Sequence, residues 1–152
     1  MVSCRTSSAS SPAPPRLCAP TRASARSLPL QTLERIALAI SEHYQSQPGL
    51  QLHKRTARTA GLGIDEVALA REWDSNDERE AALLRYLQAV VEKRGAAPMH
   101  LHEEAREAGW EDEQILEALA YVTIESFTAM VNVAGEVPVD GSVEESRTLR
   151  AA

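Results

Sequence analysis

The sequence predicts an all-α protein, a bundle of about six helices organised as helix pairs. Alanine and leucine recur at short intervals, whereas the 152 residues contain only 7 glycines and 4% aromatics. This composition favours helices over sheet. Apolar residues make up 43% of the chain and charged residues 25%, values near the globular average, and the length suits one ordinary domain.

Apolar residues recur at helical spacing from Leu30 onward. The first stripe comprises Leu33, Ile36, Ala37, Ile40 and Tyr44. Pro48 and Gly49 interrupt the pattern, which predicts a second helix from Leu50 to Ala60. Gly61 suits the position that follows a helix C-terminus, and a short third helix is expected over 64–72.

The second half of the domain predicts three more helices. Ser75 and Glu78 have the spacing of a capping box, which indicates a helix over 76–94 that ends at Gly95. Pro98 suits the first turn of a helix that closes at Gly109. The longest helix is expected over 112–134. Its apolar residues are so widely distributed around the axis that we expect it to be the central, most buried element.

An internal repeat supports the helix pairs. Residues 57–67 match residues 105–115 at an offset of 48 positions. Each copy is a helix end, a glycine turn and an acidic first turn of the next helix, where the helix dipole favours negative charge.

The first 27 residues differ from the rest of the chain. They are rich in serine, proline and arginine, and this composition is typical of a disordered tail. It is also typical of a transit peptide or of a misassigned start, and we favour the misassigned start. We therefore expect a folded domain over 28–140 and a flexible tail over 141–152.

The distribution of charges and the positions of the cysteines argue against several classes of protein. The tail holds four of the 16 basic residues and none of the 22 acidic ones, so residues 28–152 carry a net charge of −10. Such acidity argues against nucleic-acid binding. No apolar run reaches membrane-spanning length, and no secretory signal is evident, so we expect a soluble, cytoplasmic protein. Cys4 and Cys18 lie in the tail, which leaves the domain without a disulfide.

Several spaced motifs resemble the carboxymuconolactone decarboxylase and alkylhydroperoxidase D-like superfamily, in its peroxidase-related branch. They are residues 34–43, His53 and 57–62 in the first half, and 108–117, 127–128 and 131–132 in the second. The resemblance implies an alkylhydroperoxidase-like helical fold, a homo-oligomer and an antioxidant oxidoreductase activity. We expect self-association through apolar faces left uncovered around Ile36, Ile40 and the stripe over 83–91.

The resemblance also implies site residues. In that family a Glu lies twelve residues before the first cysteine of a C-x-x-C motif, and a His lies four residues after the second. Glu34 and His53 match these outer positions, whereas Ser46 and Gly49 occupy the cysteine positions. Peroxide reduction needs a thiolate to attack the O–O bond and a second thiol to resolve the product. Glu34 and His53 therefore form an acid–base pair without a nucleophile.

The resemblance thus implies a peroxidase-related protein, and the absence of the two cysteines predicts that it is catalytically degenerate. Two alternatives remain open: a non-catalytic helical oligomerisation or ligand-binding protein, and a cysteine-independent enzyme of the lactone decarboxylase type. Whether the protein is an enzyme stays open, and no residue identifies its small-molecule substrate. We expect no cofactor, no nucleic-acid partner and no membrane partner.

Three sharper hypotheses are disfavoured. Ser46, His53 and Glu34 have the residue types of a hydrolytic triad, but their spacing gives no assurance of contact. The histidines at 43, 53, 100 and 102 lack the i, i+4 pair of helical zinc sites, so we expect no metal. Cys4 and Cys18 lie in a tail without a cationic pocket, which argues against their supplying the missing thiols.

Overall fold

The computed structural model describes residues 27–139, and the predictions for residues 1–26 and 140–152 lie outside this range. Six helices make up the described domain, and none of its residues forms a strand, which confirms the all-α class. The helices are α1 (Leu30–His43), α2 (Gln47–Thr59), α3 (Ile64–Arg71), α4 (Glu78–Glu92), α5 (Met99–Glu107) and α6 (Asp112–Ala134). Within the described residues no helix is long and apolar enough to cross a membrane.

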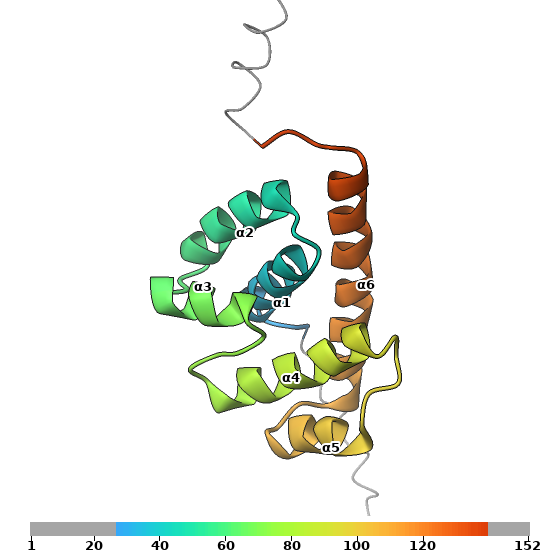
Figure 1. Ribbon diagram of the computed structural model, residues 1–152. Helices are drawn as coiled ribbons and strands as arrows, with labels where there is room; N and C mark the ends of the chain where they lie inside the picture. Colours follow the sequence, from blue (N-terminus) through green and yellow to red (C-terminus); the bar gives the residue numbers. More distant parts are fainter. Residues whose placement is uncertain (1–26, 140–152) are drawn as a thin grey trace, which may run out of the picture.

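Helix α1 is the centre of the fold. It lies between α2 and α3 on one side and α6 on the other (Figure 1). Every residue from Glu34 to Ser41 is buried. The prediction that α6 is the most buried element is wrong, because α6 covers α1 with one face and leaves Leu116 and Phe127 about two-thirds exposed on another.

The prediction that the apolar stripes around Ile36, Ile40 and Leu83 are left uncovered is also wrong. Ile36 and Ile40 are fully buried, as are Leu83 and Leu87 of α4. They form one hydrophobic core together with residues of α5 and α6. The neighbouring helices of the same chain therefore cover these residues, whereas Val90 and Val91 at the end of the α4 stripe are half-buried and line a hollow beside α6.

The two helix pairs follow the internal repeat. Gly61 lies in the turn after α2 with φ +94°, and Gly109 lies in the turn after α5 with φ +99°. These are left-handed conformations that glycine adopts without steric cost. Trp110 follows the second turn and is buried, with its indole nitrogen donating to the Arg79 carbonyl oxygen at 2.7 Å.

Two helix starts differ from the predictions. Helix α2 begins at Gln47, before Pro48, because the Ser46 hydroxyl caps it and proline is tolerated in a first turn. The predicted capping box at Ser75 is wrong. Asp77 caps α4 by accepting from the Arg79 amide at 3.0 Å, whereas the Ser75 hydroxyl is hydrogen-bonded to a carboxylate of α3.

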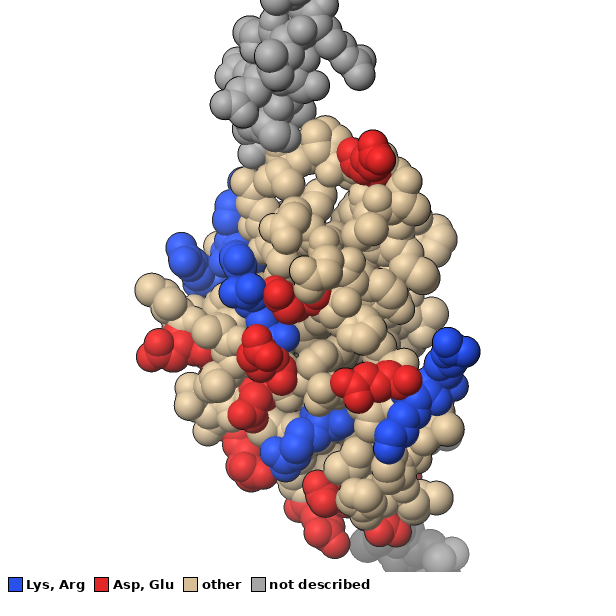
Figure 2. Space-filling model, in the orientation of Figure 1, with Lys and Arg blue, Asp and Glu red and all other residues tan. Residues whose placement is uncertain are grey.

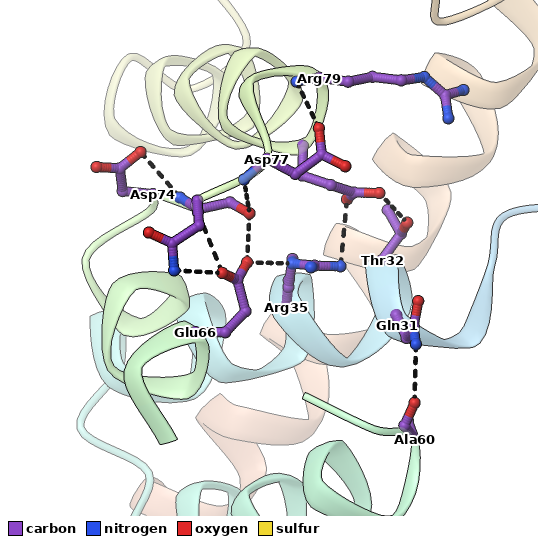
Figure 3. A network of polar contacts seen from close by, with 11 residues as sticks. Gln31, Thr32, Arg35, Ala60, Glu66, Asp74, Asp77 and Arg79 are labelled. Carbon is purple, nitrogen blue, oxygen red and sulfur yellow. Dashed lines mark hydrogen bonds and ion pairs between the residues drawn. The ribbon is translucent and has the colours of Figure 1, made fainter. Parts of the chain in front are cut away.

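A buried polar network ties α1 to α3 and α4 (Figure 3). Arg35 donates to Glu66 at 2.7 Å, and Thr32 donates to Glu80 at 2.8 Å. Glu66 also accepts from the Asn76 backbone amide at 3.1 Å. Burial opposes ionisation of Glu66, but the hydrogen bonds from Ser75, Arg35 and Asn76 outweigh it and lower its pKa. Burial raises the pKa of Glu80, and this effect outweighs the hydrogen bond from Thr32 and the positive charges of Arg35, at 3.8 Å, and Arg79.

Candidate functional site

Helices α1 and α2 bring Glu34 and His53 into contact. His53 Nδ1 lies 3.1 Å from Glu34 Oε2, and the Thr56 hydroxyl donates to the same oxygen at 2.6 Å. His53 and Thr56 lie on one side of α2 because they are three residues apart on a helix. The acid–base pair that the sequence singled out is therefore a direct hydrogen-bonded pair.

Helix α6 adds two residues that the sequence analysis missed. Glu125 Oε2 lies 3.4 Å from His53 Nε2, and the Tyr121 hydroxyl is hydrogen-bonded to Glu125. A signal for Glu125 is present in the sequence, because it is the only charged residue between positions 118 and 134, a mostly apolar stretch. A lone carboxylate in such a helix needs a partner when it turns inward.

His53 is thus held between two carboxylates, one on each ring nitrogen. A neutral imidazole has one donor and one acceptor nitrogen, so one of the two carboxylates would face a lone pair. The imidazolium donates from both nitrogens and satisfies both acids. The geometry therefore favours the charged form of His53.

The pKa values follow from this arrangement. Burial works against the imidazolium, but the hydrogen bonds and negative charges of Glu125 and Glu34 outweigh it and raise the pKa of His53 above 6.5. The hydrogen bond from His53 holds the pKa of Glu125 below its ordinary value, against the effect of burial. Burial and the neighbouring Glu125 charge raise the pKa of Tyr121, so its hydroxyl stays protonated and remains a donor.

A cleft of about 310 Å³ lies beside this cluster. Its walls come from α2 and the preceding Ser46, from Ser41 of α1, from the second half of α6, and from Val137 and Pro138, which follow α6. His53 and Glu125 line the cleft, whereas Glu34 lies behind them and is not among the lining residues. Glu125 is therefore the carboxylate of the cluster that a molecule in the cleft would meet.

Ser46 and Gly49, which the resemblance matches to the two cysteines, also line the cleft. The Ser46 hydroxyl accepts from the Gly49 amide at 3.4 Å and from the Asn132 side chain at 3.3 Å. Gly49 packs against Ser41 of α1, and a Cβ atom added to Gly49 would lie only 2.6 Å from Ser41 Oγ. The space that a side chain at position 49 would need is therefore filled.

The geometry bears on the disfavoured alternatives. Both nitrogens of His53 face carboxylates, so the ring offers no lone pair to take a proton from Ser46 as a triad requires. Residues 27–139 contain no group of three or more His, Cys, Asp or Glu side chains placed to hold a metal ion. His102 lies apart from the cleft, with its ring 5.3 Å from that of Tyr86.

Comparison with known proteins supports the fold. The described domain is a helix-pair bundle in which a histidine and two glutamates cluster beside a cleft. No protein-family profile and no curated protein sequence matches the chain. It is similar in structure to a protein of unknown function from Agrobacterium tumefaciens, provisionally described as the antioxidant defence protein AhpD. The TM-score is 0.66 and the identity 22%, over 72% of this chain and 77% of the other. The chain therefore has an AhpD-like fold.

Proposed function

We propose that this AhpD-like protein lacks thiol-peroxidase chemistry and uses its cleft to bind a small organic molecule. The observation that carries the proposal is the crowding at Gly49, where a Cβ would lie 2.6 Å from Ser41 Oγ. A resolving thiol at this position needs both a side chain and room to move toward its partner. The close contact with Ser41 supports a site adapted to the absence of that thiol.

The surrounding residues support binding. The cleft combines three groups that can carry charge, Glu125, His53 and Arg55, with uncharged residues that include Leu52, Ala129 and Val137. A pocket with a few fixed polar groups among apolar ones is typical of small-molecule sites. A volume near 310 Å³ is at the lower end of the range for such sites.

A peroxidase assay tests the first half of the proposal. The full chain and a Cys4→Ser/Cys18→Ser variant should both fail to consume hydroperoxide above buffer with a dithiol reductant. The variant is the matched control, because it removes the two thiols of the chain. Turnover that persists without them would refute the proposal.

Thiol restoration sharpens the test. A Ser46→Cys/Gly49→Cys variant should fold poorly or fail to form its disulfide, because Cβ of position 49 meets Ser41. Adding Ser41→Ala removes the crowding oxygen, so the triple variant should form the disulfide and give measurable turnover. Equal disulfide formation with and without Ser41→Ala would contradict the argument from crowding.

A second candidate function is cysteine-independent chemistry of the lactone decarboxylase type, and the position of Glu125 favours it. In such a reaction the bond between carbon and the carboxylate breaks, CO2 leaves, and a proton replaces it on carbon. His53 and Glu125 form an ion pair that can hold and deliver that proton at the cleft.

Carboxymuconolactone is the probe for this candidate. If it holds, the protein should release CO2 from the lactone, and Glu125→Gln should lower the rate about 100-fold or more. Glu103→Gln is the control, because Glu103 is exposed on α5, away from the cleft. Absence of CO2 release by the unaltered chain would leave the binding proposal and remove this second candidate.

A further inference from the structure

Helix α2 carries a concentration of positive charge in a chain whose net charge is −6. Lys54, Arg55 and Arg58 lie on this helix, and we call them the α2 basic face. Residues 43–64 contain no Asp or Glu. Arg55 and Arg58 are exposed, and Lys54 is half-buried. Figure 2 shows Lys and Arg side chains grouped over the region where α2 lies in Figure 1.

Two of these cations lack an acidic neighbour in the described domain. Within residues 27–139 neither Lys54 nor Arg58 forms an ion pair, although several arginines of other helices do. Lys54 and Arg58 are four residues apart, and like charges at that spacing on a helix repel each other. An acidic segment over the α2 basic face would relieve this repulsion.

The chain that follows α6 turns toward α2. The Val137 amide donates to the Asn132 carbonyl oxygen at 3.0 Å, and Glu136 has φ +47°, a combination that reverses the chain at a helix end. Pro138 restricts the backbone on both sides of it, which fixes the direction of the chain. Val137 and Pro138 line the cleft together with Arg55. Figure 1 shows this segment running from the end of α6 across toward α2.

The residues that come next in the sequence have the charge that α2 needs. Asp140, Glu144 and Glu145 lie within six positions, and no basic residue lies among them. Six extended residues span about 20 Å, whereas the α2 basic face occupies only about 6 Å of the helix axis. Residues 1–26, the other segment outside the described range, hold four arginines and no acid. Of the two segments, only 140–145 complements α2.

We propose that residues 140–145 bind the α2 basic face of the same chain, beside the opening of the cleft. The carboxylates of this segment pair with the ammonium and guanidinium groups of α2. A single exposed ion pair contributes little, but the covalent link to α6 gives the segment a high local concentration at α2. Because Arg55 lines the cleft, the bound segment narrows the opening. That consequence for ligand entry rests on the proposed function, whereas the docking does not.

Paramagnetic relaxation in the full-length chain tests the docking. A nitroxide is attached to Ser146→Cys in the Cys4→Ser/Cys18→Ser background, so that it directly follows the acidic segment. We expect loss of the amide signals of residues 54–58, while those of α5 remain. In about 1 M salt, where the screening length falls to about 3 Å, the lost signals should return.

Charge reversal on α2 and on the segment gives the decisive comparison. Lys54→Glu/Arg58→Glu should restore the α2 signals, because the segment is then repelled. Adding Glu144→Lys/Glu145→Lys to that variant reverses both partners and should remove the signals again. Lys54→Gln/Arg58→Gln is the second variant should the charge reversal disturb α2. None of these measurements uses a ligand of the cleft, so their outcome is separate from that of the function proposed above.

Lys93→Glu/Arg94→Glu is the matched control. It reverses two exposed cations that follow α4, outside the α2 basic face, and should leave the loss of α2 signals unchanged. Sharp α2 signals in the unaltered chain, or a loss that charge reversal on α2 leaves intact, would overturn the proposal. So would a loss seen only between molecules, in a mixture of isotope-labelled chain and spin-labelled chain, because the segment would then bind a second copy.

Discussion

Replacing Gly49 with alanine should destabilise the protein, and replacing Ser41 with alanine as well should remove most of that cost. The added Cβ would lie 2.6 Å from Ser41 Oγ and 3.0 Å from Ser46 Oγ. Ser41 is 2% exposed and lies at the wall of the cleft, so an added Cβ displaces its hydroxyl from a nearly buried position. Overpacking of this kind costs about 1–3 kcal/mol.

Two contributions of opposite sign determine how much Gly49→Ala changes the free energy of unfolding. Gly49 lies in the first turn of α2, and alanine is favoured over glycine in a helix by roughly 0.5–1 kcal/mol. We therefore expect Gly49→Ala to lower the free energy of unfolding by about 1–2 kcal/mol in the unaltered chain. In a Ser41→Ala background the same change should be close to neutral. The coupling between the two positions should thus exceed about 1 kcal/mol.

Urea unfolding of the four proteins of this double-mutant cycle measures the coupling. With a slope of about 1–3 kcal/mol/M, a loss of 1 kcal/mol moves the midpoint by roughly 0.3–1 M. Gly63→Ala is a useful control, since a Cβ there meets nothing within 4 Å. If Gly49→Ala costs the same with and without the Ser41 hydroxyl, the reasoning from crowding is refuted, and with it the main support for the degenerate site.

Three further outcomes follow from the geometry. NMR titration of His53 should give a pKa above 6.5, and Glu125→Gln should lower that pKa. The charged ring stabilises the folded state fully below pH 6.5, and this stabilisation is lost as pH rises through the folded-state pKa. Because the folded state raises the pKa of Glu80, stability should fall as pH rises from 4.5 through that raised value, and urea unfolding of Glu80→Gln should lack this decline. Trp110→Phe should lower the free energy of unfolding by about 1–2 kcal/mol in the same assay. It removes the 2.7 Å hydrogen bond to the Arg79 carbonyl oxygen and weakens the cation–π contact with the Arg79 guanidinium at 3.8 Å. An unchanged free energy of unfolding would show that neither contact contributes.

The positions of the helices were predictable because their signals are local. Gly61 and Gly109 adopt the left-handed conformation expected after a helix, and α6 spans the residues that its apolar pattern indicates. The capping prediction at Ser75 failed for a tertiary reason. The Ser75 hydroxyl has a partner on α3, Glu66, so Asp77 takes over the cap of α4.

Only part of the candidate site could be predicted from the sequence. Glu34 and His53 follow a spacing motif, and the structure brings them together. Glu125 and Tyr121 complete the cluster from α6, and no local pattern specifies which turn of α6 passes His53. Sequence spacing also says nothing of the Ser41 hydroxyl that fills the space beside Gly49.

By itself, then, the amino-acid sequence determined the all-α class, the helix pairs and the absence of thiols from the domain. Only the tertiary structure decided that α1 is the central helix, that His53 lies between two carboxylates, and that α6 carries most of the exposed large apolar side chains. The physical reason is the range of the interactions. Helix periodicity and turn chemistry act over a few residues, whereas burial and the charge of a side chain depend on which distant segments pack against it.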